Sequence, residues 1–279
     1  MIRILLQGRT GNNLFQYAVG RALAQRHNTS LILDGAWSNK AHAETFSHLL
    51  RLPINATYER KFTILKRLAN RFLRIKPEIL HAGPVIIDHS DGLVPDLSLA
   101  SANSLLIGFF QSPILFDSVE QEIRNELDLT KIVIPPESVD FENKLHEQLT
   151  VSLHVRRGDY LAIQDTQCLA SDYHKKAIEW FRSRHENLRF CVFSDDIPWC
   201  KKHFLEEDFV FADLQGSSDD PLHDLRLMAA CDHHIIVNSS YSWWGAWLNP
   251  SNSKQVVAPE MWMKNFSSKN IIPNTWTSL

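Results

Sequence analysis

Residues 151–160 read VSLHVRRGDY, an apolar run that passes directly into two arginines, a glycine and an aspartate. Alternate residues of an extended chain share a face, so His154 and Arg156 point to one side and Arg157 points to the other. A buried strand that ends in charged residues is typical of the carboxyl edge of a parallel sheet, where ligands bind in open α/β folds. This stretch therefore predicts both the fold class and the place of the site.

Short apolar runs bounded by polar residues recur on both sides of this strand. In the first half, they predict strands at 2–6, 31–33, 85–87 and 105–107, and a helix at 14–26. In the second half, they predict strands at 151–155, 190–193, 209–211, 234–237 and 255–258, and helices at 137–149 and 173–184. Strands that alternate with helices indicate an α/β fold with parallel sheets.

The length of 279 residues favours two lobes, because a single hydrophobic core stops growing near this size. Strand and helix signals pause at 135–136, where two prolines adjoin. We expect a Rossmann-like lobe at 1–145, a second one at 146–258, and a segment at 259–279 that packs across the lobes. Two such lobes are expected to face a cleft.

The composition excludes several classes of protein. A net charge of −3 gives no general attraction for nucleic acid, and none of the four cysteines forms a C-x-x-C pair. The apolar start of the chain is too short for a signal peptide or a membrane span, which favours a cytoplasmic protein. The phosphate-binding patterns of kinases and dehydrogenases are missing, as are zinc-binding histidine patterns.

The arginines of 151–160 suggest an anionic ligand. A guanidinium fork matches two phosphate oxygens and is permanently charged, so Arg156 can neutralise a leaving diphosphate without magnesium. The alternative is that both arginines form structural ion pairs with Asp159, Asp195 or Asp196.

The segment 235–244, IIVNSSYSWW, is a second candidate for phosphate binding. It breaks from an apolar strand into small hydroxyl residues before a helix that we expect to start near Ser242. The N-terminus of that helix and the serine hydroxyls favour an anion, although simple capping is the alternative. We expect the tryptophans of this segment to pack in the core.

Carboxylates at strand ends complete the set of candidates. Asp195 and Asp196 are adjacent on a strand and point apart, which disfavours a shared metal ion, and no Asp-x-Asp triplet occurs in the chain. We therefore expect a site without metal. Asp195, Asp196 and Asp232 can instead bind a guanine edge or a ribose hydroxyl.

Residues 60–76 carry seven basic and no acidic residues, with apolar residues at helical spacing. Such a helix can rest on an anionic membrane surface and collect lipid-linked acceptors. A solvated helix that packs one face on the first lobe is the equal alternative.

The chain resembles a known family of sugar transferases. Residues 154–160 match the H-x-R-R-G-D-Y signature of the inverting α-1,2-fucosyltransferases, and residues 8–18, 108–112 and 238–247 are similar to further segments of that family. The resemblance implies a GT-B fold, in which the first lobe leans toward a galactose-terminated acceptor and the second holds GDP-fucose as co-substrate. It implies neither a cofactor nor a metal. A bacterial enzyme of surface polysaccharide is indicated, cytoplasmic or peripheral on the inner face of the membrane.

The resemblance also assigns roles to residues. It places Arg156 on the β-phosphate, His154 and Asp232 on the nucleoside, and Asn12 on the sugar-diphosphate side. It places the diphosphate on four residues: Ser239, Ser240, Tyr241 and Ser242. We expect Arg157 to assist Arg156, and Asp159 to act as general base or to fix Arg157. Where the family usually has G-N-Q, this chain has Asn13 in place of the glutamine.

Two alternatives stay open at this stage. One is a related fucosyltransferase of different linkage, such as α-1,6 or O-linked transfer. The other is an inert protein that binds a GDP-sugar or a glycan without catalysis.

Overall fold

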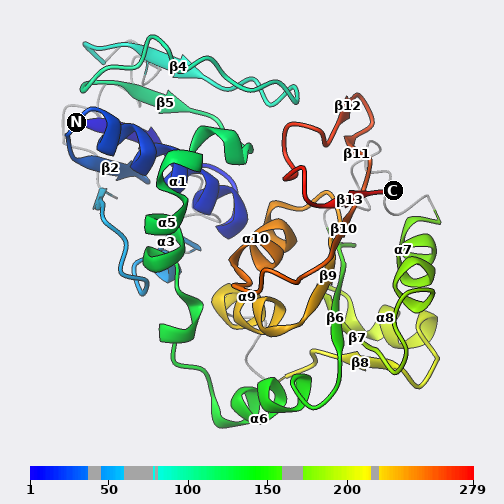
Figure 1. The fold of residues 1–279 in the computed structure, drawn as a ribbon. Coiled ribbons are helices and arrows are strands. Elements are labelled where there is room, and N and C mark those ends of the chain that lie inside the picture. Colours follow the sequence, from blue (N-terminus) through cyan, green and yellow to red (C-terminus); the bar gives the residue numbers. More distant parts are fainter. Residues whose placement is uncertain (37–44, 60–77, 79–80, 159–171, 215–219) are drawn as a thin grey trace. The chain divides into compact units, whose positions relative to one another are not determined.

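The computed structural model describes residues 1–36, 45–59, 78, 81–158, 172–214 and 220–279 (Figure 1). The chain divides into two units, Met1–Leu127 and Asp128–Leu279. Each is built on a parallel sheet, so the predicted α/β class is confirmed. The predicted basic helix at 60–76 lies outside the described residues.

The first unit contains a five-stranded parallel sheet in the order β3-β2-β1-β5-β4. Its strands are β1 (Ile2–Leu5), β2 (Leu31–Asp34), β3 (Thr57–Glu59), β4 (Val85–Ile87) and β5 (Leu105–Ile107). Four of them lie where the apolar runs predicted strands. The short strand β3 was missed because Thr57-Tyr58-Glu59 shows no apolar run.

Helix α1 (Thr10–Arg26) follows β1 and is buried over most of its surface. At Gly20 an added Cβ would lie 2.7 Å from a Leu31 methyl group, so glycine allows the close approach to β2. The helix begins four residues before the predicted start at Leu14, since the backbone N–H of Asn13 already donates to the carbonyl of Arg9. The unit also contains α3 (Thr45–Leu49), α5 (Glu120–Glu126) and two 3₁₀ turns, Pro113–Leu115 and Asp117–Val119.

The second unit contains a six-stranded parallel sheet in the order β13-β10-β9-β6-β7-β8. Its strands are β6 (Thr150–Val155), β7 (Arg189–Ser194), β8 (Phe209–Phe211), β9 (His233–Ile235), β10 (Val256–Ala258) and β13 (Thr277–Ser278). Every residue of β6 is buried, which agrees with its central place in the sheet. Strand β6, which contains the first residues of the segment 151–160, is therefore a central strand of this unit.

The first helix of the second unit precedes these strands, and the other helices connect them. They are α6 (Pro136–Leu145), α7 (Tyr173–Arg182), α8 (Ile197–His203), α9 (Pro221–Ala230) and α10 (Ser240–Leu248). A 3₁₀ turn, Leu129–Lys131, precedes α6, and a small antiparallel pair, β11 (Met261–Met263) and β12 (Phe266–Ser267), follows β10. Among the helices of the described ranges, none has the length and apolar composition to cross a membrane.

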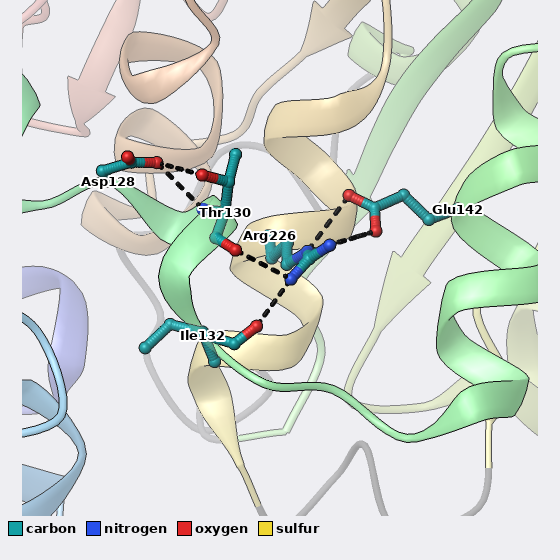
Figure 2. A network of polar contacts seen from close by, with 5 residues as sticks. All are labelled: Asp128, Thr130, Ile132, Glu142 and Arg226. Atoms are coloured by element: carbon teal, nitrogen blue, oxygen red, sulfur yellow. Dashed lines mark hydrogen bonds and ion pairs between the residues drawn. The ribbon is translucent and has the colours of Figure 1, made fainter.

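The boundary between the units lies earlier than the predicted one at 145–146. Arg226 of α9 binds both carboxylate oxygens of Glu142 on α6, with a closest distance of 2.7 Å. The same guanidinium donates to the carbonyls of Thr130 and Ile132. Figure 2 shows this network, in which Asp128 also caps the turn at Thr130. These contacts attach residues 128–145 to the second unit.

The segment 259–279 was also predicted as a separate piece, and the structure counts it within the second unit. Strand β13 pairs with β10, and the Trp276 ring lies 5.6 Å from the ring of Trp243 on α10. The Trp243 Nε1–H donates to the carbonyl of Ile271. The expected packing of this segment across both lobes stays a prediction.

Removal of the Arg226 guanidinium should destabilise the second unit. In Arg226→Ala the largely buried carboxylate of Glu142 and the carbonyl of Ile132 lose their partner, so we expect the melting temperature to fall by roughly 5–10 °C. Arg124→Ala, which breaks the exposed i,i+4 pair with Glu120, should change it by no more than about 2 °C. Circular dichroism on heating measures both, and equal shifts would contradict the anchoring role.

Candidate functional site

Three polar segments meet at the carboxyl edge of the second sheet. Arg156 follows β6, Asp195 follows β7, and Ser239 lies on the chain that leaves β9. Because β6 pairs in parallel with both β7 and β9, the ends of these strands lie side by side. The predicted placement of these residues at one edge of the sheet is confirmed.

The carboxylate of Asp195 joins the ends of β6 and β7. Its Oδ2 atom lies 2.8 Å from Nη1 of Arg156, and its Oδ1 atom accepts a hydrogen bond of 2.8 Å from the backbone N–H of Arg157. At Gly158 an added Cβ would lie 2.6 Å from Asp195 Oδ2, so a side chain at this position would displace the carboxylate. Asp195 holds Arg156 in place, as the ion-pair alternative predicted.

Arg157 is held by a different set of partners from Arg156. Its Nε–H donates to Asp196 Oδ2 at 3.0 Å, and its guanidinium lies 3.8 Å above the ring of Trp199. Trp199 in turn stacks on His203, and Asp196 caps α8 by accepting from the Trp199 N–H. Arg157 and Asp196 therefore fix the framework around Arg156, and the expected contact of Asp196 with a nucleoside stays a prediction.

His154 is a buried, neutral residue on the same strand. Burial, the charge of Arg156 and the nearby His174 lower its pKa to about 3. Its carbonyl oxygen can only accept, so the 3.1 Å contact with His174 places a proton on Nε2 of His174. Within the described residues, Nδ1 of His154 is buried and has no hydrogen-bond partner. A buried polar atom without a partner costs about 1–3 kcal/mol, which a ligand can recover.

Helix α10 begins at Ser240, two residues before the predicted start at Ser242. Ser239 is the N-cap residue, and its side chain makes no capping hydrogen bond. The Ser242 hydroxyl donates to the Ser239 carbonyl at 3.3 Å. The first turn of a helix directs backbone N–H groups outward at the positive end of its dipole, so this end of α10 favours an anion.

The tryptophans of α10 pack in the core, as predicted. Trp243 and Trp244 are fully buried, and Trp247 is 5% exposed. Trp243 stacks on Trp247 with ring centroids 5.9 Å apart. This packing fixes the helix whose N-terminus lies at the site.

Asp224 on α9 is a candidate that the sequence did not reveal. Its Oδ1 atom is buried and has no hydrogen-bond partner among the described residues. Burial and the neighbouring charge of Asp220 raise the pKa of Asp224 to about 7. Burial, together with the charges of Asp224 and Asp220, raises the pKa of Tyr241, whose ring centroid lies 6.1 Å from that of His154. Asp224 and His154 therefore lie near the same tyrosine.

Asp224 is retained at a cost in stability. Since its folded-state pKa is raised, the folded protein loses stability as the pH rises from about 4, where the unfolded carboxyl ionises, to about 7. Strongly perturbed carboxyls of this kind concentrate at functional sites. Helical periodicity could have revealed the residue, because Leu227 and Met228, three and four positions along the same face, are both buried.

Asp232 does not belong to this group, so its predicted contact with a nucleoside is wrong. It precedes β9, and its carboxylate accepts from the backbone N–H of Thr150, the first residue of β6. Arg156 lies six residues further along, or about 20 Å at the rise of an extended strand. Asp232 therefore lies where the strands begin, and Arg156 lies where they end.

The other predicted residues lie elsewhere in the chain. Asp159 falls outside the described residues. Asn12 belongs to the first unit, where its Oδ1 accepts from Gln111, so its predicted place beside the donor stays a prediction. Asn13, the departure from the G-N-Q pattern, is fully buried and donates to the Gln7 carbonyl and to Gln16. Across the described ranges, no three His, Cys, Asp or Glu side chains gather as metal ligands do.

The arrangement suits a ligand with two chemically different parts. A permanent cation beside a helix N-terminus favours a group such as a diphosphate. A buried carboxylate and a neutral imidazole favour a planar group that presents N–H donors.

Comparison with known proteins identifies a matching family. The profile of glycosyl transferase family 11 matches residues 91–279. An α-1,2-colitosyltransferase of Escherichia coli is 30% identical over 303 aligned positions, which cover 98% of this chain and 97% of that protein. The O-antigen biosynthesis glycosyltransferase WbnK of Escherichia coli is 27% identical, with 98% and 99% covered.

Less similar proteins include other fucosyltransferases. Human galactoside α-(1,2)-fucosyltransferase 1 is 29% identical over 253 aligned positions, which cover 86% of this chain and 63% of that protein. Among solved structures, the fucosyltransferase NodZ from Bradyrhizobium matches with a TM-score of 0.51 at 15% identity, covering 87% of this chain and 91% of that chain. This last likeness concerns the fold.

Proposed function

This chain belongs to glycosyl transferase family 11, and we propose that it transfers L-fucose from GDP-fucose to the 2-hydroxyl of a galactose on a glycan acceptor. The transfer inverts the anomeric centre and needs no metal ion. The observation that carries the proposal is Arg156, held by Asp195 at the carboxyl end of β6 and close to the chain that leaves β9 toward α10.

The leaving group of this reaction is GDP, so negative charge develops on its β-phosphate in the transition state. Arg156 and the N-terminal turn of α10, with Ser239 and Ser242, stabilise that charge. Both groups are positioned in advance by the sheet and the tryptophan core, which is the condition for effective electrostatic catalysis. A permanent guanidinium here takes the role that a divalent cation has in other sugar transferases.

The nucleoside is recognised by Asp224 and His154. An ionised carboxylate can accept both from N1–H and from the 2-amino group of guanine, and adenine offers no such pair of donors. Neutral His154 has a buried nitrogen that needs a partner. This assignment replaces Asp232, which the resemblance had suggested.

The acceptor hydroxyl attacks from the face opposite the departing GDP, through a transition state with oxocarbenium character. We keep Asp159 as the candidate general base. A largely dissociative transition state needs little assistance from a base, so the contribution of Asp159 is smaller than that of Arg156.

The biological acceptor is a galactose-terminated, lipid-linked oligosaccharide of a surface polysaccharide. The name of the WbnK relative, an O-antigen biosynthesis glycosyltransferase, supports this proposal. We place the reaction on the cytoplasmic side of the membrane, with residues 60–76 as the candidate peripheral contact.

The names of the relatives support the α-1,2 linkage over the other linkages considered, and they favour catalysis over a binding role. They also raise a second candidate, because the relative at 30% identity is named as a colitosyltransferase. Colitose is fucose without its 3-hydroxyl group, so the same site chemistry serves both donors. The donor sugar therefore has to be determined by experiment.

Product analysis tests the proposed function. The purified protein, in EDTA, is given GDP-fucose or GDP-colitose together with a methyl β-galactoside. We expect a fucosylated product whose NMR spectrum shows an α-1,2 linkage, formed faster than the colitosylated one. Faster colitosyl transfer would establish the second candidate. Another linkage, a requirement for added metal, or GDP binding without any transfer would each overturn the proposal.

Arg156→Ala should lower the transfer rate by about a hundredfold to a thousandfold, because the charge on the leaving diphosphate loses a positioned donor. Arg156→Lys should recover little, since an ammonium group lacks the two-pronged geometry. Arg182→Ala is the matched control, because it removes an exposed arginine of the same unit that pairs with Asp208. Initial rates and melting curves are measured on each variant. Turnover at the wild-type rate in folded Arg156→Ala would refute the role.

Asp224→Asn should weaken GDP binding and reduce the preference for GDP over inosine diphosphate, which lacks the 2-amino group. The advantage of the wild type over the variant in GDP affinity should shrink as the pH falls below about 7, because the carboxylate then takes up a proton. Ionisation of the GDP phosphates changes the affinity of both proteins in the same way, so it does not alter the difference between them. Calorimetry measures the affinities, with exposed Asp213→Asn as control. An unchanged nucleotide preference would exclude contact with guanine.

A further inference from the structure

A strained turn follows β5 in the first unit. Phe110 is fully buried and has φ +53°, in the left-handed region that non-glycine residues rarely adopt. Gly108, two residues earlier, has φ +138°. A left-handed conformation costs roughly 1–2 kcal/mol for a residue with a side chain, and such strain concentrates at functional sites.

Side chains from two other segments hold this turn. Asp88, which follows β4, accepts hydrogen bonds at Oδ2 from the backbone N–H groups of Phe109 and Phe110, at 3.1 and 2.6 Å. Buried Gln16 on α1 donates to the Gly108 carbonyl at 2.7 Å. An added Cβ at Gly108 would lie 2.5 Å from Asp88 Cβ, so this packing requires glycine. The turn is therefore fixed from both sides.

The turn presents Gln111 to the carboxyl end of a neighbouring strand. Strands β1 and β5 are parallel neighbours, so the residues that follow them lie at the same edge of the first sheet. The Nε2 of Gln111 donates to Oδ1 of Asn12 at 2.7 Å. Asn12 lies against Gly8, where an added Cβ would approach its Nδ2 to 2.3 Å. Both amides are partly exposed, so a ligand can reach them.

We propose that the Asn12–Gln111 amide pair binds hydroxyl groups of the acceptor sugar, an inference that rests on the proposed function and that replaces the expected place of Asn12 beside the sugar diphosphate. A primary amide offers both a donor and an acceptor, as a hydroxyl group does, so two fixed amides match neighbouring hydroxyls of an uncharged ring. The charged diphosphate and the guanine are matched by Arg156, α10 and Asp224 in the other unit.

The strain explains why the pair can discriminate between sugars. A site built to bind a hydroxyl rejects an analogue without it, because its own polar groups are then left without a partner. That discrimination requires fixed groups, and the Asp88 and Gln16 contacts fix the backbone that carries Gln111. Asp88 is thus a positioning residue for the acceptor, one step removed from contact with it.

Gln111→Ala tests the proposal. The probes are methyl β-galactoside and its 3-, 4- and 6-deoxy analogues, with GDP-fucose as donor. Wild-type protein should reject at least one deoxy analogue by about tenfold or more in kcat/KM, and Gln111→Ala should lower that selectivity toward unity while the acceptor KM rises about tenfold. The affinity for GDP and the rate of GDP-fucose hydrolysis without acceptor should stay within about twofold.

Three further variants complete the design. Gln121→Ala is the matched control, because it breaks the exposed Gln121–Asn125 amide pair on α5 and should change no parameter. Gln111→Asn keeps the amide on a shorter side chain and serves where the alanine variant fails to fold; it should show a smaller loss of selectivity. Asp88→Asn, which replaces the charged acceptor that holds the turn, should reduce the selectivity in the same direction.

The outcomes are distinct. Unchanged acceptor KM and selectivity in folded Gln111 variants would overturn the proposal. A rise in the KM for GDP-fucose, or a fall in its hydrolysis rate, without an acceptor effect would assign the pair to the donor sugar and also overturn it. If wild-type protein neither transfers nor hydrolyses GDP-fucose, the proposed function itself fails, whatever the variants show.

Discussion

The ion pair between Arg156 and Asp195 is the contact on which the candidate site depends. It joins the ends of two adjacent central strands, and the same carboxylate also binds the backbone of Arg157. A lone guanidinium at a sheet edge would move among many conformations, and ordering it would consume part of the binding energy. The carboxylate orders it in advance. The cation is thereby fixed beside the strand end that leads into α10.

Around this cation, the protein keeps two titratable groups in unusual states. His154 is buried as a neutral imidazole, and Asp224 is buried with a pKa near neutrality. Each leaves a polar atom without a partner among the described residues, which opposes stability. Such groups are tolerated when a ligand supplies the missing hydrogen bonds, and under the proposed function that ligand is the nucleotide of the donor.

The two units share one arrangement of polar residues but differ in the chemistry of those residues. In each, polar side chains gather after neighbouring parallel strands, as open α/β sheets require. The second unit provides a guanidinium, a helix N-terminus and a carboxylate, which match a charged nucleotide. The edge of the first unit presents the amides of Asn12 and Gln111 on a strained turn. This division agrees with a reaction that joins a charged donor to an uncharged sugar.

The sequence by itself determined the α/β class, most of the strands, the place of Arg156 at a strand end and the burial of the α10 tryptophans, because alternation, apolar runs and a specific local motif are properties of short segments. Only the tertiary structure decided which carboxylates share an edge. Asp232 precedes its strand and Asp195 follows one, so they lie at opposite edges, a difference that residue type does not express. The raised pKa of Asp224 was decided only by the packing of α9, since burial and the neighbouring charge of Asp220 set it. The unit boundary likewise depended on Arg226, which reaches back across the sequence to Glu142.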